Sequence, residues 1–502
     1  MKHIRLFATG LWLTFAFGSA FAQNFERPEL PDSSMMLQLA GIGTAGGGDF
    51  QPFWFTANRW GALSVEGHRP TLLVGVYDRP RNIGRGWSLR YGATITTNRD
   101  LDNNARAQDV LLALDKGASR FAFGTRSHDT PLNDEDLSTG AFALGRNAMQ
   151  PLSLSWQVKR WWRIGGAHSK FALRGHLAYG WLQDGDWQER RMVPVKGRFA
   201  TGAKYHEKSG YLRIGTDDSP WEFIGGLEMA NTFGGTIHNY DSTPLKMPER
   251  AAEYLYAFVG KGGGDPTDGE GYANASGNTI GAWRASLRYR AKDDWQARLY
   301  YDHYFEDDSQ AFDEYGWLDG LLGVEIRFPR NRWVGKMVGE VTRMDYQSGP
   351  VYHDHTREIP DQVSGVDNYY NHGLYAGWQH YGMAMGNALF ASPLYDGKKN
   401  LQFPATRFRA EHIGIAGQPF SQLHYRLMYS HLKSWGTYSI PFHEIQHQHS
   451  LLAEARWEGG TFSRGQLRGR CYATAAVGAD FGDRLGHRLG FMLSFGIRLF
   501  GK

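Results

Sequence analysis

The sequence predicts an all-β protein, an antiparallel transmembrane β-barrel in the outer membrane. Three observations predict this fold class. The chain starts with an export signal, apolar and polar residues alternate in one segment after another, and no later apolar run is long enough for a membrane-spanning helix. Any passage through a bilayer must therefore be made by strands, and strands cross a bilayer only as closed barrels.

The first 22 residues have the three parts of a secretory signal peptide. A charged start precedes an apolar run over Leu6–Phe17, and Ala20–Ala22 reads Ala-Phe-Ala, an A-x-A cleavage site. A transmembrane anchor would need ~20 apolar residues, so this run is too short for one. We therefore expect residues 1–22 to be removed and residues 23–502 to form one barrel domain.

Composition excludes several function classes. The net charge of +4 is too small to suggest a nucleic-acid binder. The single cysteine, Cys471, rules out an internal disulfide framework and a cysteine-rich metal site. The 63 glycines and the 14% of aromatic residues favour twisted strands and tight turns over helices.

Period-two alternation places apolar residues on one face and polar residues on the other in many segments. It is clear at Trp87–Thr96, Phe171–Trp181, Trp283–Arg290 and Trp295–Asp302. The last segment, Leu489–Leu499, has leucine, phenylalanine and isoleucine at every second position. In a membrane barrel the apolar face meets lipid and the polar face meets the lumen. Long polar or glycine-rich stretches between such segments predict extracellular loops.

Arginines recur on the predicted polar faces. In the core of a soluble sandwich they would be buried without partners, at several kcal/mol each, whereas a wet lumen tolerates them. A soluble sandwich or propeller with these faces exposed is the alternative, although no fixed repeat supports a propeller. We expect either that these arginines attract acidic polymers or that they pair with carboxylates. The near balance of 55 basic and 51 acidic residues favours pairing. The predicted lumen arginines are Arg284, Arg288, Arg298, Arg426 and Arg498.

Five parts of the chain carry a resemblance to a known family. They are Gly48–Gly61 (GDFQPFWFTANRWG), Leu137–Pro151, Tyr300–Ile326, Ser348–Asn387, and His431–Tyr438 followed by Ser450–Trp457. They occur in order over most of the mature chain. With them the sequence resembles the Wzi-type capsule assembly proteins, which are outer-membrane β-barrels.

This resemblance implies a barrel of about eighteen strands with a lectin-like role: it would bind and organise or anchor capsular or other surface polysaccharide. It implies no catalysis and no cofactor, and it suggests the polysaccharide export machinery as a further partner beside outer-membrane lipid. The best-known branch of the family has a helical region near its N-terminus, but residues 23–71 show little helical periodicity here. An outer-membrane porin or glycan-uptake channel is the alternative function.

Two stretches supply candidate glycan-binding residues, because sugars need hydrogen-bonding groups together with flat aromatic faces. For the histidine-rich stretch, an internal polar network or a metal site would explain the same composition. The aromatic residues from Phe53 to Trp60 could instead lie in the membrane's aromatic belt or pack in the barrel mouth. The candidates are Asn58, Arg59, Trp60, His353, Asp354, His355, Asn371, His372, Trp378 and His380.

Two motifs suggest catalysis but lack its context. His443–His447 spells H-E-x-x-H, which binds zinc only on a helix. Pro441 and the strand pattern from Ser450 predict a hairpin loop instead, so we assign no metal site. The carboxylates between Glu306 and Glu314 could suggest a glycosidase, but such clusters are more often solvated turns or partners of arginines. We therefore predict no catalytic residue.

Overall fold

The structure is a computed structural model that describes most of the chain after the predicted signal peptide. The described residues are 27–28, 30–67, 69–97, 105–126, 132–166, 168–240, 242–260, 277–306, 318–353, 362–396, 400–464 and 467–501. The predicted signal peptide therefore lies outside the described residues.

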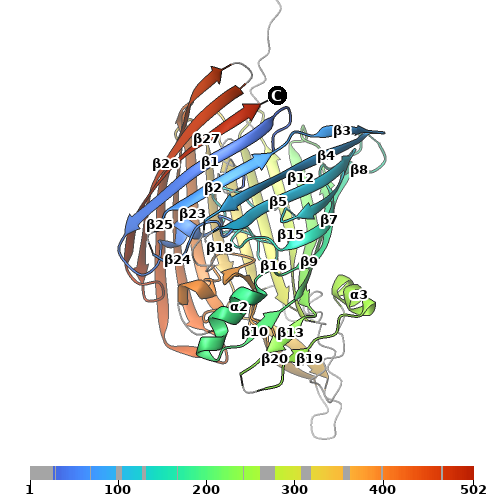
Figure 1. The fold of residues 1–502 in the computed structure, drawn as a ribbon, viewed down its shortest axis with the longest axis vertical. Helices are drawn as coiled ribbons and strands as arrows, with labels where there is room; N and C mark the ends of the chain where they lie inside the picture. The colour runs from blue at the N-terminus through green and yellow to red at the C-terminus, as the bar shows by residue number, and fades with distance from the viewer. Residues whose placement is uncertain are drawn as a thin grey trace, which may run out of the picture.

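In these residues, eighteen antiparallel strands form one closed barrel (Figure 1). Two of the eighteen are interrupted. The segments β2 and β3 both pair with β4 and count as one strand, and the segments β7 and β8 both pair with β9 and count as another. The barrel closes where β1 pairs with β27, from Met35 opposite Gly501 to Gly46 opposite Gly490. The strands of the barrel are β1 (Met35–Gly46), β2 (Thr71–Tyr77), β3 (Arg81–Gly84), β4 (Trp87–Thr96), β5 (Arg106–Lys116), β6 (Ser119–Gly124), β7 (Leu152–Val158), β8 (Trp162–Arg163), β9 (Phe171–Trp181), β11 (Lys204–Ile214), β12 (Trp221–Phe233), β15 (Asn278–Arg290), β16 (Gln296–Glu306), β17 (Gly320–Arg327), β18 (Lys336–Arg343), β23 (Arg407–Phe420), β24 (Leu423–Gly436), β25 (Pro441–Arg464), β26 (Leu467–Gly482) and β27 (Arg488–Gly501).

The alternation predicted from the sequence is confirmed as an inside–outside pattern. Along β27, Leu489, Phe491, Leu493 and Phe495 are exposed on the outer wall, whereas Met492 and Ser494 are buried inside. Exposed leucine, isoleucine, valine and phenylalanine side chains continue around the other strands and form an apolar outer belt. A soluble protein rarely exposes so much contiguous apolar surface, so lipid is the solvent that this belt fits.

All long connections leave the same end of the barrel, the lower end in Figure 1. The start of β1 and the end of β27 lie at the other end. Short turns face the periplasm in outer-membrane barrels, which makes the end with the long loops extracellular. None of the helices in the described ranges is long and apolar enough to cross a membrane. The elements in the loops are α1 (Phe53–Thr56), α2 (Gly185–Met192), η2 (Val193–Val195), β10 (Phe199–Thr201), β13 (Thr236–His238), β14 (Leu245–Lys246), α3 (Ala251–Val259), β19 (Ser348–His353), β20 (Gln362–Val366), β21 (Gln379–His380), β22 (Met383–Ala384) and η4 (Pro393–Asp396).

Three loops fold back into the barrel and form a plug, which we define as the described residues of 47–67, 132–151 and 367–406. Most of their residues are buried. Their apolar side chains join inward-facing residues of β1, β2 and the barrel strands from β11 to β27 in one hydrophobic cluster. On the remaining side, Gln108 of β5 donates to the carbonyl of Trp60, so the plug spans the lumen. Phe53, Trp54 and Phe55 belong to this cluster, with Phe55 fully buried beside β25 and β26. The aromatic stretch therefore packs inside the barrel, and its alternative placement in the membrane's aromatic belt is wrong.

A charge on the outer belt should destabilise the barrel. Leu299 is 49% exposed and stands between Leu287 and Val324 in the register. We expect Leu299→Arg to lower the free energy of unfolding by ~2–4 kcal/mol, because the guanidinium would replace an alkyl group in hydrocarbon. Urea titration in lipid vesicles measures this change. Leu318→Arg, an exposed leucine before β17, is the matched control and should have little effect; equal losses in both variants would argue against a lipid-facing belt.

Candidate functional site

Carboxylates of the barrel wall hold the plug in place. Glu340 on β18 accepts hydrogen bonds from the Ser138 hydroxyl (2.6 Å), the Thr139 N–H (2.9 Å) and hydroxyl (2.6 Å), and the Tyr300 hydroxyl (2.5 Å). Asp480 on β26 accepts one from the N–H of Phe53 at 2.9 Å. Each carboxylate thereby satisfies buried donors that the lumen would otherwise leave without partners.

Glu454 on β25 connects the first plug loop to the wall. Its carboxylate contacts the Arg59 guanidinium of the plug and lies 2.8 Å from Nε of Arg426 on the neighbouring strand. The side chains of Arg59, Glu454 and Arg426 are largely buried, with 4%, 12% and 15% exposed. Removing one partner of such a group leaves a desolvated charge, so the group fixes the position of the loop.

The five predicted lumen arginines all point inward, and each bonds to the residue directly opposite on a neighbouring strand. Four of these partners are carboxylates and one is an amide. The pairs are Arg284–Asp302, Arg288–Glu222, Arg298–Glu325, Arg426–Glu454 and Arg498–Gln38. Arg284 also contacts Glu228 and, from the plug, Asn133. Carboxylates therefore neutralise four of the five arginines, as the pairing hypothesis requires, and the fifth bonds to an amide, so these five do not line an open cationic channel.

Nearby cations also determine the pKa values of buried carboxyl groups in and beside the plug. Burial alone would raise the pKa of the Asp134 carboxyl, but the Lys336 ammonium at 2.7 Å and the Arg327 guanidinium at 3.4 Å outweigh it and hold the pKa well below its usual range. Asp319, directly before β17, forms no ion pair with a cation of the described residues. Burial raises its pKa to about 6, although the N–H groups of Tyr346 and Gln347 donate to it.

Most of the sequence-predicted glycan-binding residues lie inside the plug. Trp378 is fully buried and donates from Nε1 to Ala143 O at 3.2 Å, and His380 is fully buried beside Met149 O at 2.8 Å. Asn371 donates to Phe403 O and accepts from its N–H. They form an internal network, and in this structure no sugar could lie against them without the plug opening. Their role in glycan binding stays a prediction.

The first predicted stretch is equally enclosed. Asn58 donates to the carbonyls of Ser138 and Thr139, Arg59 pairs with Glu454, and Trp60 lies 4.2 Å beneath the Arg27 guanidinium. His372 is only partly buried, and its Nδ1 accepts from the N–H groups of Leu374 and Tyr375.

Of the remaining predicted residues, the structure describes some only in part or not at all. Asp354 and His355 lie outside the described residues, and His353 is described only as backbone in β19. Of the acidic cluster, Glu306 is described: it accepts from the N–H of Tyr370 at 2.5 Å and from the Tyr304 hydroxyl.

The H-E-x-x-H segment is part of a strand. The prediction of a hairpin loop at His443–His447 is wrong, because β25 already begins at Pro441 and pairs with β24. Successive side chains of a strand point to opposite faces, so Glu444 lies on one face of β25 and the two histidines lie on the other. Among the described residues, no group of three or more histidine, cysteine or acidic side chains is arranged to hold a metal ion.

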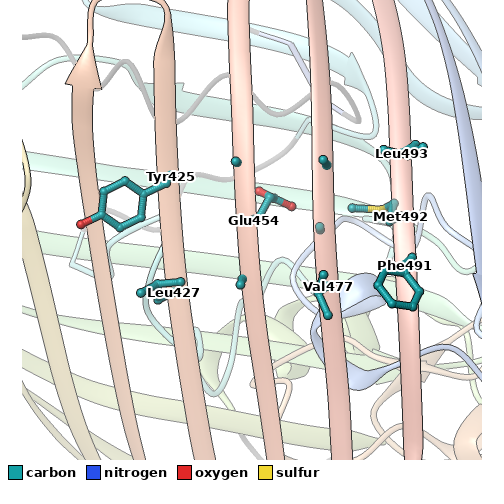
Figure 2. Close-up of a pocket in the computed structure, with 11 residues that line it drawn as sticks. Tyr425, Leu427, Glu454, Val477, Phe491, Met492 and Leu493 are labelled. Carbon is teal, nitrogen blue, oxygen red and sulfur yellow. The ribbon is translucent and has the colours of Figure 1, made fainter.

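A groove of about 380 Å³ lies on the outer wall across β24–β27 (Figure 2). Its lining includes the alanines Ala453, Ala455 and Ala475, and Leu427 and Phe491 from the strands on either side. Its lining is almost entirely apolar and belongs to the lipid-facing belt, so it does not suit a sugar.

The extracellular mouth carries an exposed face that suits a sugar better. We call it the mouth face and define it by residues of α2, of β13 and of the segments that follow α2 and β13. Tyr240 is 50% exposed, and Nζ of Lys196 lies 4.4 Å from the centre of its ring. Arg198 donates from Nε to Asn239 at 2.7 Å and also contacts the carbonyl of Gly373, beside His372. The residues of the mouth face are Arg190, Arg191, Lys196, Arg198, His238, Asn239 and Tyr240.

Sequence reasoning missed the mouth face. The region between Trp181 and Lys204 loses the strand alternation while it gains Arg190, Arg191, Lys196 and Arg198. A cluster of basic residues in a loop between two strands was the available signal. Its pairing with Tyr240 depends on the small β10–β13–β14 sheet, which joins two different loops.

A closed antiparallel barrel with an apolar outer belt, a charged lumen and long loops at one end is a β-barrel of the outer-membrane type. No protein-family model and no curated protein matches the sequence. The fold is similar to that of Wzi of Escherichia coli, described as an outer membrane protein involved in group 1 capsule assembly and a carbohydrate-binding β-barrel. That likeness has a TM-score of 0.52 at 10% identity and covers 92% of this chain and 83% of that one.

Two further solved barrels are also similar. OccAB2 of Acinetobacter baumannii has a TM-score of 0.47 at 8% identity, with 93% of this chain and 98% of that chain covered. OccK3 (OpdO) of Pseudomonas aeruginosa has a TM-score of 0.46 at 10% identity, with 94% and 96% covered. At 10% identity the likeness to Wzi establishes the fold alone, so the resemblance to the Wzi-type family is supported only as a likeness of fold.

Neutralising Glu454 should loosen the plug. We expect Glu454→Gln to lower the free energy of unfolding by about 3–5 kcal/mol, because Arg59 and Arg426 would lose the carboxylate that they share in a buried site. Urea titration measures the loss, and limited proteolysis of intact cells should show faster cleavage in residues 47–67. Glu444→Gln, an exposed glutamate on the same strand, is the control. The assignment would be wrong if both variants unfolded at the same urea concentration.

Proposed function

We propose that the protein is an outer-membrane barrel that binds surface polysaccharide at its extracellular mouth and organises or anchors it without catalysing a reaction. The observation that carries the proposal is the mouth face, an exposed basic and aromatic surface held above a lumen that the plug spans. The fold likeness to a carbohydrate-binding barrel supports the same class of ligand.

The mouth face has the chemistry that an acidic polysaccharide needs. The Tyr240 ring offers a flat apolar surface for the C–H face of a sugar, and Lys196 beside it offers a charge for a carboxylate. Arg191 lies 3.4 Å from Glu66 of the first plug loop, which connects the face to the plug. A rigid, cationic and partly aromatic surface favours a charged polymer, whose repeats can engage it in succession.

The plug argues against the alternative of a porin or uptake channel. The plug loops pack against inward-facing residues of most barrel strands, and the luminal arginines are bonded to their opposite neighbours. We therefore expect little steady conductance in planar bilayers. Large, stable channels would favour the alternative, because an open pore requires the plug to leave the lumen.

The binding proposal is tested on a glycan array with the full-length protein in detergent. We expect acidic polysaccharides to bind and the binding to weaken as salt is raised. In Lys196→Gln/Tyr240→Ala the affinity for the strongest ligand should fall about tenfold, because one ionic contact and one stacking surface are lost.

Arg330→Gln is the control for that variant. It removes an exposed charge at the short-turn end, between β17 and β18, and should leave binding unchanged. Equal affinity of wild type and the double variant for every glycan on the array would exclude the mouth face as the binding surface.

A further inference from the structure

A row of basic side chains crosses four neighbouring strands on the outer wall, near the extracellular end. Arg343 on β18 stands opposite Arg409 on β23, which stands opposite Lys433 on β24, and Lys433 stands opposite His447 on β25. We call these four residues the rim row. Like charges placed directly opposite one another destabilise a sheet. Such an arrangement is stable when an anion compensates it.

The level of the rim row relative to the membrane follows from the register. Four residues nearer the short-turn end along the same strands, Ile413, Tyr429 and Leu451 form an exposed row of the apolar belt. Four residues span ~13 Å along a strand, and the strand tilt reduces this to about 10 Å along the membrane normal. The rim row therefore lies at the level of the lipid headgroups, just above the hydrocarbon.

Acidic side chains compensate the rim row only in part. Asp345 accepts from Arg343 at 2.8 Å and from Arg409 at 2.6 Å. Glu411, in the row beneath, lies 2.8 Å from Nδ1 of His431. Among the described residues, no carboxylate is within ion-pairing distance of Lys433.

Aromatic rings next to the row hold the cations in position. The guanidinium of Arg409 and Nζ of Lys433 lie 5.8 and 5.3 Å from the centre of the Trp435 ring. Arg407, a further cation above the row, lies 3.7 Å over Tyr438, whose hydroxyl donates to Tyr346 O at 2.9 Å. Tryptophan and tyrosine favour the interfacial zone, so the rings and the cations indicate the same depth.

We propose that the rim row binds the phosphate groups of an anionic lipid in the outer leaflet. Nε and Nη2 of Arg409 already donate to Asp345, so its Nη1 side remains to donate to a phosphate, and Lys433 supplies a point charge beside it. The exposed belt directly below would receive the acyl chains of the same molecule. This inference does not depend on the polysaccharide proposal, since the mouth face and the rim row share no residue.

The test uses the full-length protein in neutral detergent with lipid A, a phosphorylated outer-leaflet lipid, as the probe. Native mass spectrometry counts the lipid molecules retained. We expect Arg409→Gln/Lys433→Gln to bind lipid A about thirtyfold more weakly, the factor expected for two basic side chains at an anionic lipid surface. The matched control, Lys292→Gln/Arg330→Gln, removes the same two charges from exposed turns at the opposite end and should bind as wild type does.

Two further measurements identify the source of the phosphate. Lipid A without its phosphates should bind wild type as weakly as lipid A binds the rim variant. Inorganic phosphate at millimolar concentration should not displace lipid A, because it lacks the acyl chains that the belt receives. The proposal would be overturned by any one of three results. The rim variant could retain as much lipid A as wild type does, wild type could bind lipid A equally well without its phosphates, or inorganic phosphate could displace lipid A completely.

Discussion

The pairing of β1 with β27 is the constraint on which the rest of the structure depends. A strand with an unpaired edge cannot remain in hydrocarbon, so the sheet must close, and closure gives every strand two neighbours. Once the sheet is closed, alternate residues face either lipid or lumen. The apolar belt, the inward-facing arginines and the rim row all follow from this division of one wall between two solvents.

Charge pairing within the wall determines where cations remain available to ligands. Inside the barrel each predicted lumen arginine bonds to its opposite neighbour, and plug loops use further carboxylates such as Glu340. On the mouth face and along the rim row, at the extracellular end, the cations are less fully compensated than these lumen arginines. The two surfaces face different surroundings, one toward the aqueous exterior and the other toward the lipid headgroups, so one barrel can present two kinds of anion site.

The barrel could be predicted from the sequence because alternation between two solvents is a local signal. Trp87–Thr96 and Phe171–Trp181 are strands with the predicted bounds. The plug and the mouth face could not be predicted in this way. Composition showed that Trp378 and His380 suit either a sugar or an internal network, but only long-range packing decides that both are buried. At His443–His447, polar residues hid a strand because the wall there rises above the hydrocarbon and no longer needs apolar side chains.

The anchoring of the plug has a consequence for the order of folding. Phe53 bonds to Asp480, and Arg59 to Glu454, so partners separated by 427 and 395 residues must meet. Contacts of such sequence separation form late, because the entropy of closing a long loop is lost before any stabilising contact is made. The N-terminal loop can therefore reach its final conformation only after the C-terminal strands have joined the sheet, and a chain truncated before β25 would lack both partners.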